Sequence, residues 1–96
     1  MRFPIRIFRV RSSSMEPTLS DGDYVIASAW HGKLREGDIV VLRHPSNGMP
    51  IVKRVKAVGN GRLFVVGDNW QYSEDSRTLG ALGIGTVIGK VLFSAK

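Results

Sequence analysis

Serine and lysine are the residues of this sequence whose types and spacing could carry covalent chemistry. Three consecutive serines, Ser12 to Ser14, open a segment that ends at Leu19 and contains Pro17, so it is a poor candidate for a helix. A hydroxyl-rich turn at the end of a strand can hold one serine rigidly at a cleft, although most such turns have no catalytic role. A serine hydroxyl is a weak nucleophile until a base removes its proton, so the chemistry needs a second residue.

Lys53 is the candidate for that base. Strand alternation places its side chain between Ile51 and Val55 on one face of a β-rich run. Arg54 and Lys56 project to the opposite face, where we expect them to reach water. Burial penalises the ammonium form of a lysine and lowers its pKa from the ordinary value of about 10.4, as a general base requires. The alternative is a structural lysine that is salt-bridged or whose ammonium extends to water.

Other catalytic and binding chemistries find little support in the sequence. The chain has no cysteine, which excludes disulfides, thiolate zinc sites and a cysteine nucleophile. The two histidines, His31 and His44, lie in loop-like contexts, and no motif places either in a Ser–His–Asp triad or at metal-ligand spacing. The glycines at 59 and 61 belong to a hairpin turn, not to a phosphate-binding loop. We therefore expect no metal and no cofactor.

The elements that must position these side chains are short strands. The apolar pattern predicts about six of them and no helix of ten or more residues: Arg2–Arg11, Asp23–Ala29, Asp38–Arg43, Pro50–Val58, Arg62–Val66 and Gly83–Phe93. The run at residues 38–43 is almost continuously apolar, which predicts burial on both faces. In the first strand the alternation slips between Ile7 and Phe8, which predicts a bulge. The fold class is therefore all-β.

Composition and length describe one small folded domain. The chain has 96 residues, of which 43% are hydrophobic and 23% charged, so we expect a single domain over residues 1–96. The net charge of +6 could attract nucleic acid, an anionic membrane or an acidic substrate, or could simply keep a strand edge from aggregating. No apolar run approaches the roughly 18–20 residues that span a bilayer. We expect a cytoplasmic protein with at most peripheral membrane contact.

Four segments, in this order, resemble the sequence boxes of the signal peptidase I family of Ser–Lys endopeptidases. They are Ser12–Leu19 (Ser-x-Ser-Met-x-Pro-Thr-Leu), Gly37–Val41, Ile51–Val55, and Gly67–Asn69 continuing to Ser73–Arg77. The first and last are specific, and the resemblance extends from about Ser12 to Lys90. It implies the coiled β-sheet fold that signal peptidases share with the self-cleaving SOS-response repressors.

The resemblance assigns the catalytic roles to matching positions. It implies that Ser14 is the acyl-forming nucleophile and that Lys53 is its general base. It also implies that the Ser12 hydroxyl and the Ser14 backbone N–H form the oxyanion hole. Ser13 stands where the family often has glycine, so the backbone there must accept a Cβ.

The last box supplies supporting residues. The resemblance implies that Ser73 orients the lysine amine and that Asp75 and Arg77 form a structural ion pair beneath the site. Asp68 and Asn69 match the Gly-Asp-Asn turn, where we expect loop hydrogen bonds. The alternative for all of these is a polar loop that caps its own backbone.

Two residues and one short segment bear on substrate binding. Met15 and Leu19 could line the binding groove or fill the core, and the sequence does not separate the two. The segment at residues 70–72 departs from the more charged residues common in the family and is expected to shape the cleft.

The function implied by the resemblance is a serine endopeptidase whose partner is a leader-bearing precursor protein. Ser14 lies too close to the N-terminus for an anchor, so we expect none, and only a hairpin separates Lys53 from Gly67, a layout similar to that of nickel-type superoxide dismutase maturation peptidases. One alternative is a general signal peptidase-like protease that works at a membrane. An alternative of another class is a basic β-barrel that binds nucleic acid or acts as a repressor-type module, but the aromatic residues form no obvious stacking platform, so no nucleic acid is expected.

Overall fold

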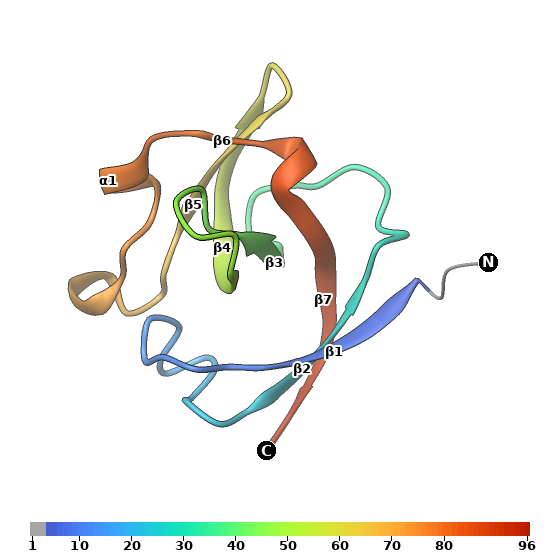
Figure 1. The fold of residues 1–96 in the computed structure, drawn as a ribbon, viewed down its shortest axis with the longest axis vertical. Helices are drawn as coiled ribbons and strands as arrows, with labels where there is room; N and C mark the ends of the chain where they lie inside the picture. The colour runs from blue at the N-terminus through green and yellow to red at the C-terminus, as the bar shows by residue number, and fades with distance from the viewer. Residues whose placement is uncertain (1–3) are drawn as a thin grey trace.

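The computed structural model describes residues 4–96, which form one curled antiparallel sheet (Figure 1). Seven strands follow the spatial order β1-β2-β7-β3-β4-β5-β6. Their bounds are β1 Ile5–Arg9, β2 Tyr24–Ser28, β3 Ile39–Arg43, β4 Pro50–Gly59, β5 Arg62–Val66, β6 Leu82–Gly83 and β7 Val87–Ala95. The helical turns are η1 Trp70–Tyr72, α1 Ser76–Leu79 and η2 Ile84–Thr86. None of the helices in this part of the chain is long and apolar enough to cross a membrane.

The all-β class is confirmed, with two differences in detail. The sheet has seven strands because the predicted last strand is divided into β6 and β7, and a two-residue strand leaves almost no periodicity to read. The predicted bulge in the first strand is wrong, since β1 pairs with β2 in one continuous register. Ile7 instead projects from an uncovered face and is 66% exposed, while Val10 points inward. Part of the predicted first strand, residues 2 and 3, lies outside the described residues.

The core lies on both faces of β3, as its apolar run predicts. Val40, Val41 and Leu42 are all fully buried. Val40 and Leu42 pack into one apolar cluster with residues of β4, β5 and β6, whereas Val41 packs into a second cluster with residues of β2 and of the turn after β1. The sheet must therefore curl so that its two ends cover opposite faces of β3.

The clearest predicted hairpin, β4–β5, is confirmed. Asn60 and Gly61 have φ angles of 53° and 73°, the left-handed pair that a tight two-residue hairpin turn requires. β4 is twice as long as β5, and β5 pairs with it only from Arg54 onward. Residues 50–53 of β4 thus have no β5 partner along one edge.

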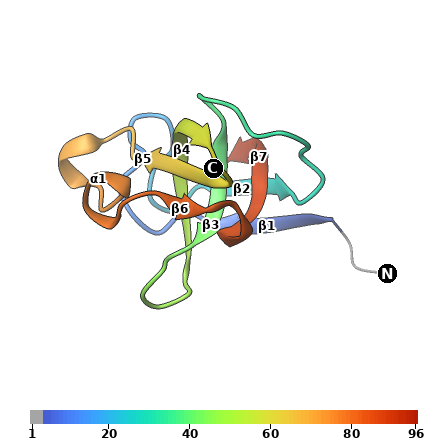
Figure 2. The ribbon, with the colours of Figure 1, turned by 90° about the horizontal axis from the view of Figure 1, so that it is seen from above.

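The curl places two loops on the same side of the molecule. They are the turn after β1 at residues 12–19, called the serine turn below, and the loop after β5 at residues 67–75. In Figures 1 and 2, α1 and the loop before it lie away from the N-terminus, beside the turn that follows β1. Hydrogen bonds join these two segments, because the Asn69 backbone N–H donates to the Ser14 carbonyl over 2.9 Å. The sheet therefore brings the serine turn against the loop that follows β5.

Candidate active site

The serine turn is held from two sides. Ser14 is buried, with 5% of its surface exposed, and its Oγ lies 3.1 Å from Ser12 Oγ. The Ser14 backbone N–H donates to the same Ser12 oxygen over 3.3 Å, so the Ser12 side chain contacts both the hydroxyl and the backbone of Ser14. Asn69 fixes the turn from the other loop, since its backbone N–H binds the Ser14 carbonyl and its side-chain amide donates to the Ser13 carbonyl over 3.0 Å. Asn69 was expected to make loop hydrogen bonds, and these bonds attach its loop directly to the serine turn.

Lys53 lies on β4, opposite Val40 of β3, and only 5% of it is exposed. Its Nζ donates to Ser73 Oγ over 3.0 Å. Ser73 in turn donates its hydroxyl to Asp75 Oδ2 over 2.7 Å. Because a serine hydroxyl has only one proton, this pattern leaves the Ser73 oxygen as an acceptor for the lysine.

Asp75 anchors this chain of hydrogen bonds. Its carboxylate is fully buried and accepts from Arg77 Nε and Nη2, at 2.9 and 3.0 Å, and from the Gly67 backbone N–H at 2.9 Å. It also caps the N-terminus of α1 by accepting from the Arg77 backbone N–H. Burial alone would raise the pKa of this carboxyl, but the hydrogen bonds from Arg77, Gly67 and Ser73 outweigh it and hold the pKa well below its usual range.

Burial has the opposite consequence for Lys53. Desolvation penalises its ammonium form and lowers the pKa of the amine from its ordinary value. The carboxylates of Asp75 and Glu74 raise that pKa, and Arg77 lowers it, but burial is the largest cause. The site therefore favours a neutral amine at lower pH than a surface lysine would allow.

A second carboxylate–arginine pair joins the serine turn to β4. Asp68 accepts from Arg54 Nε and Nη2 at 2.8 and 2.7 Å, and from the hydroxyl of Thr18. Arg54 also donates to the Gly37 carbonyl over 2.7 Å. Arg54 holds the pKa of Asp68 below its ordinary value, because its hydrogen bonds favour the carboxylate.

Arg54 reaches water as expected, since 32% of its side chain is exposed, but its pairing with Asp68 and the contribution of Thr18 were not predicted. The sequence contains only part of the signal. The tight turn at residues 60 and 61 sets the pairing of β4 with β5 near the turn, but a register shift between Val55 and Ala57 is needed to place Arg54 opposite Val66, two residues before Asp68.

A cavity of about 440 Å³ opens beside the serine turn. Its walls are residues 7–11, from β1 onward, and residues 49–53, at the start of β4, and Ser12, Ser14, Met15 and Val41 complete the lining. Consecutive residues of a strand point to opposite faces, so a cavity that touches five in a row runs along the strand edge. The cavity therefore lies between two strand edges that have no partner there, with Ser14 and Lys53 in its wall.

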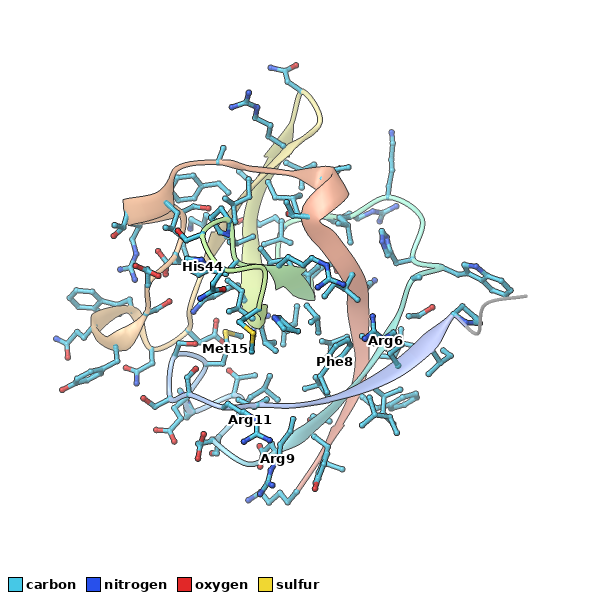
Figure 3. The ribbon with its side chains drawn as sticks, in the orientation of Figure 1. Arg6, Phe8, Arg9, Arg11, Met15 and His44 are labelled. Carbon is cyan, nitrogen blue, oxygen red and sulfur yellow. The ribbon has the colours of Figure 1, made fainter. Side chains whose placement is uncertain are left out.

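The two apolar residues of the serine turn have different positions. Met15 belongs to the core cluster around Val41 and also lines the cavity (Figure 3). Leu19 is buried in the same cluster. Of the two alternatives in the sequence, core packing describes Leu19, whereas Met15 does both, and we assign no substrate contact to Leu19.

At Gly67 the serine turn meets the hydrogen-bonded chain of Lys53, Ser73 and Asp75, called the lysine network below. A Cβ built on its backbone would overlap the Ser73 hydroxyl and the Ser14 carbonyl oxygen, which lies 2.5 Å from that position. No real Cβ contact is that short, so any other residue would push the two segments apart. Glycine is required here by close approach, since no positive φ is involved.

Both histidines lie outside the network of Lys53, Ser73 and Asp75. His44 lies in the turn between β3 and β4 (Figure 3). Its Nε2 lies 2.7 Å from Glu74 Oε1. His31 binds the neighbouring Gly32 carbonyl. Within residues 4–96, no group of three or more histidine, aspartate or glutamate side chains is arranged to hold a metal ion.

Comparison with known proteins places these residues in a family. The chain is 28% identical to the mitochondrial inner membrane protease subunit 2 of Saccharomyces cerevisiae, over 92% of this chain and 66% of that protein. It is 34% identical to the signal peptidase I of Buchnera aphidicola, over 58% of this chain and 23% of that protein. The chain thus spans slightly less than two thirds of the first relative and about a quarter of the second. The family model for signal peptidase, peptidase S26, matches residues 1–60 and 56–95, and the chain therefore belongs to the signal peptidase family.

Proposed function

We propose that this protein is a serine endopeptidase that removes an N-terminal leader peptide from a precursor protein, with Ser14 as nucleophile and Lys53 as general base. The observation that carries the proposal is the buried chain of hydrogen bonds from Lys53 through Ser73 to Asp75, with Ser14 and Lys53 in the wall of one cavity. A lysine placed in this way has its pKa lowered and its amine oriented, which are the two requirements for a base.

Acylation follows from the roles of these groups. The neutral amine of Lys53 donates one N–H to Ser73, which leaves its lone pair free to accept the Ser14 hydroxyl proton. Ser14 Oγ then attacks the scissile carbonyl carbon, and the carbonyl π electrons move to oxygen. As the C–N bond breaks, the Lys53 ammonium returns the proton to the leaving amine, and the leader remains as an ester on Ser14.

The oxyanion of each tetrahedral intermediate needs donors in a fixed position. We assign this role to the Ser12 hydroxyl and the Ser14 backbone N–H; the N–H donates to Ser12 Oγ over 3.3 Å and must exchange that contact for the oxyanion. Donors of this kind each contribute roughly 3–4 kcal/mol to transition-state stabilisation. Deacylation repeats the same steps, with water in place of the serine hydroxyl and Lys53 again as the base.

The substrate binds in extended form between the two strand edges of the cavity. Within residues 4–96, the end of β1 at residues 7–9 and the start of β4 at residues 50–53 both present backbone groups without a strand partner on that side. An extended peptide can pair with such an edge by adding a strand. Met15, Met49 and Ile51 then contact its side chains, which gives the cavity an apolar preference.

Within this function we propose the precursor of a nickel-type superoxide dismutase as the first substrate to test. The support is the layout of the chain, in which only the β4–β5 hairpin lies between Lys53 and Gly67. Residues 1–96 would act as one catalytic domain, in the cytoplasm and with peripheral membrane contact at most.

The test is cleavage of that precursor by the wild type and by Ser14→Ala and Lys53→Ala, with each product N-terminus determined by mass spectrometry. We expect one defined cut by the wild type, no cut by Ser14→Ala, and a loss of about 10²–10⁴-fold in Lys53→Ala. Ser46→Ala and Lys56→Ala, which change exposed residues, serve as matched controls and should cleave normally. Full activity of Lys53→Ala would contradict the proposed base.

A second candidate is a general leader peptidase that works at a membrane. The name of one relative contains the words inner membrane protease. On this chain, Ile7, Ile26 and Phe93 lie side by side on the outer face of β1, β2 and β7, where Ile7 and Phe93 are 66% and 67% exposed. A dyad-dependent cut of a general secretory leader, without any cut of the superoxide dismutase precursor, would favour this candidate.

The arginines give little support to the nucleic-acid-binding alternative, because four of them already contact other side chains. Arg54 and Arg77 are engaged with carboxylates, and Arg6 and Arg9 stack on Phe8 and Tyr24. Salt-sensitive binding to single-stranded DNA that persists in Ser14→Ala would be needed to revive it.

A further inference from the structure

The turn between β3 and β4, at residues 44–49, forms part of the cavity wall. Met49 lines the cavity, and Pro50, the first residue of β4, continues the same wall. In Figure 2 this turn, drawn in green, extends beyond the body of the sheet. Met49 is 60% exposed, so the core does not hold it in place. The position of this part of the wall therefore depends on the contacts that hold the turn.

His44 makes most of the hydrogen bonds inside this turn. Its backbone N–H donates to the Met49 carbonyl over 2.8 Å, and its carbonyl accepts from the Gly48 N–H over 2.9 Å. The Ser46 backbone N–H donates to His44 Nδ1 over 3.0 Å, so this nitrogen carries no proton. The proton of the neutral ring is therefore on Nε2. The turn thus holds the ring in one orientation and one tautomer.

The Nε2–H of the ring binds the loop after β5. His44 Nε2 lies 2.7 Å from Glu74 Oε1, and only 13% of the histidine side chain is exposed. Glu74 stands between Ser73 and Asp75, which both belong to the lysine network, so its backbone is anchored on either side. Among the described residues, no other hydrogen bond or ion pair joins residues 44–49 to a segment outside the β3–β4 hairpin. This one contact therefore attaches the turn to the loop.

We propose that His44 is a positioning residue that, through its contact with Glu74, fixes the β3–β4 turn and with it the part of the cavity wall against which the substrate binds. The inference rests on the proposed function, because that function makes the cavity a substrate site. The hydrogen bonds of His44 go to its own turn and to Glu74, so its loss changes substrate binding and not the acylation chemistry. A released wall would occupy its binding position for only part of the time, and the apparent affinity falls by that fraction.

The experiment compares the full chain with His44→Leu, Glu74→Ala, Glu74→Gln and the double variant His44→Leu with Glu74→Ala. KM and kcat are measured separately for cleavage of the precursor. The mobility of the turn is measured without substrate, from the NMR relaxation of the backbone amides of residues 46–49. His31→Leu is the matched control, because the His31 ring binds the carbonyl of its neighbour Gly32.

We expect His44→Leu and Glu74→Ala each to raise KM about 3–10-fold, with kcat within about twofold of the wild type and with greater mobility of residues 46–49. The double variant should be no worse than His44→Leu, because both changes remove the same contact. Glu74→Gln keeps an acceptor for the Nε2–H of His44 and should stay near the wild type. An unchanged KM, a loss confined to kcat, or additive effects in the double variant would overturn the proposal.

Two safeguards keep the outcome interpretable. If His44→Leu fails to fold, Glu74→Ala tests the same contact at a side chain that is 61% exposed, and an unchanged KM in that variant would overturn the proposal. If the wild type does not cleave the precursor, the proposed function fails, and the mobility of residues 46–49 alone decides the inference. Greater mobility in both His44→Leu and Glu74→Ala would then support the positioning of the wall, and unchanged mobility would overturn it.

Discussion

Asp68 and Asp75 lie seven residues apart in one loop, and each is paired with an arginine, yet they do different work. Asp75 is fully buried and binds an arginine two residues away. It also accepts a hydrogen bond from the Ser73 hydroxyl beneath Lys53. Asp68 is partly exposed and binds Arg54 on a different strand, and it accepts from Thr18 in the serine turn. In the proposed mechanism, Asp75 supports the proposed base and Asp68 supports the turn that carries the proposed nucleophile.

The difference shows how a small domain separates two tasks. The pair with the fully buried carboxylate is proposed to act on chemistry, because Asp75 accepts from Ser73, which binds Lys53. The pair with the more exposed carboxylate is proposed to act on geometry, since it joins two segments that already have other contacts, such as those of Asn69 with the serine turn. Exposed ion pairs are weakened by water and salt, so loss of the second pair should be better tolerated.

The largest effect is expected from Asp75→Asn, which removes the carboxylate below Ser73. The neutral amide cannot form an ion pair with Arg77, and it accepts a weaker hydrogen bond from the Ser73 hydroxyl. Ser73 is then held less firmly, and the lysine loses its orientation. We expect precursor cleavage to fall by about 10²–10³-fold and the melting temperature by roughly 10 °C. Asp21→Asn, at an exposed aspartate, is the control for both measurements. Cleavage within about threefold of the wild type would mean that Asp75 does not support the base.

Gly67→Ala should rank next, because the new methyl group would overlap both the Ser73 hydroxyl and the Ser14 carbonyl. The serine turn and the lysine network would be pushed apart, and misplacement by about 1 Å can cost 10²-fold in rate. We expect about that loss in kcat, with KM changed less. A Cβ at Gly85 meets no atom within 4 Å, so Gly85→Ala is the matched control. Unchanged kcat in Gly67→Ala would show that the two segments can separate without cost.

Asp68→Asn should have a smaller effect of about tenfold on kcat/KM, because Asn69 still holds the serine turn. Its side chain is 16% exposed and that of Arg54 is 32% exposed, so solvent already weakens the pair. The loss should diminish further when the wild type and the variant are compared at high salt. A loss as large as that of Asp75→Asn would erase the distinction between the two pairs.

Acid should remove the stability difference between the wild type and Asp75→Asn. The pKa of Asp75 is depressed in the folded protein, so its contribution is fully present above the unfolded value of about 3.9 and is lost as the pH falls below it. The melting-temperature gap should therefore be constant above about pH 4 and shrink below it. Thermal unfolding followed by circular dichroism would reveal this. A gap that persists unchanged to pH 2 would mean that the carboxylate charge is not the source of the stability.

Local patterns predicted much of the fold. The apolar run of β3 predicted burial on both faces, and the glycine–asparagine turn predicted the β4–β5 hairpin. The burial of Lys53 followed from strand alternation in the same way. These features depend on neighbours within a few residues, so the sequence contains them.

Long-range pairings could not be read in the same way. Arg54 meets Asp68, and His44 meets Glu74, only after the strands have taken their register and the sheet has curled. The position of Met15, in both the core and the cavity wall, also depends on where the sheet closes. Spacing along the chain does not specify such contacts, because loops of different lengths can bring many residue pairs together.

The most direct test of the central claim replaces the proposed base by a weaker one. The chain has no cysteine, so Lys53→Cys can be alkylated selectively with bromoethylamine to give a lysine analogue whose amine is less basic. We expect Lys53→Cys to be inactive, and alkylation to restore precursor cleavage with the acid limb of the kcat/KM profile moved to lower pH. Substantial activity in unmodified Lys53→Cys, or restored activity with an unmoved acid limb, would contradict the assignment of Lys53 as the base.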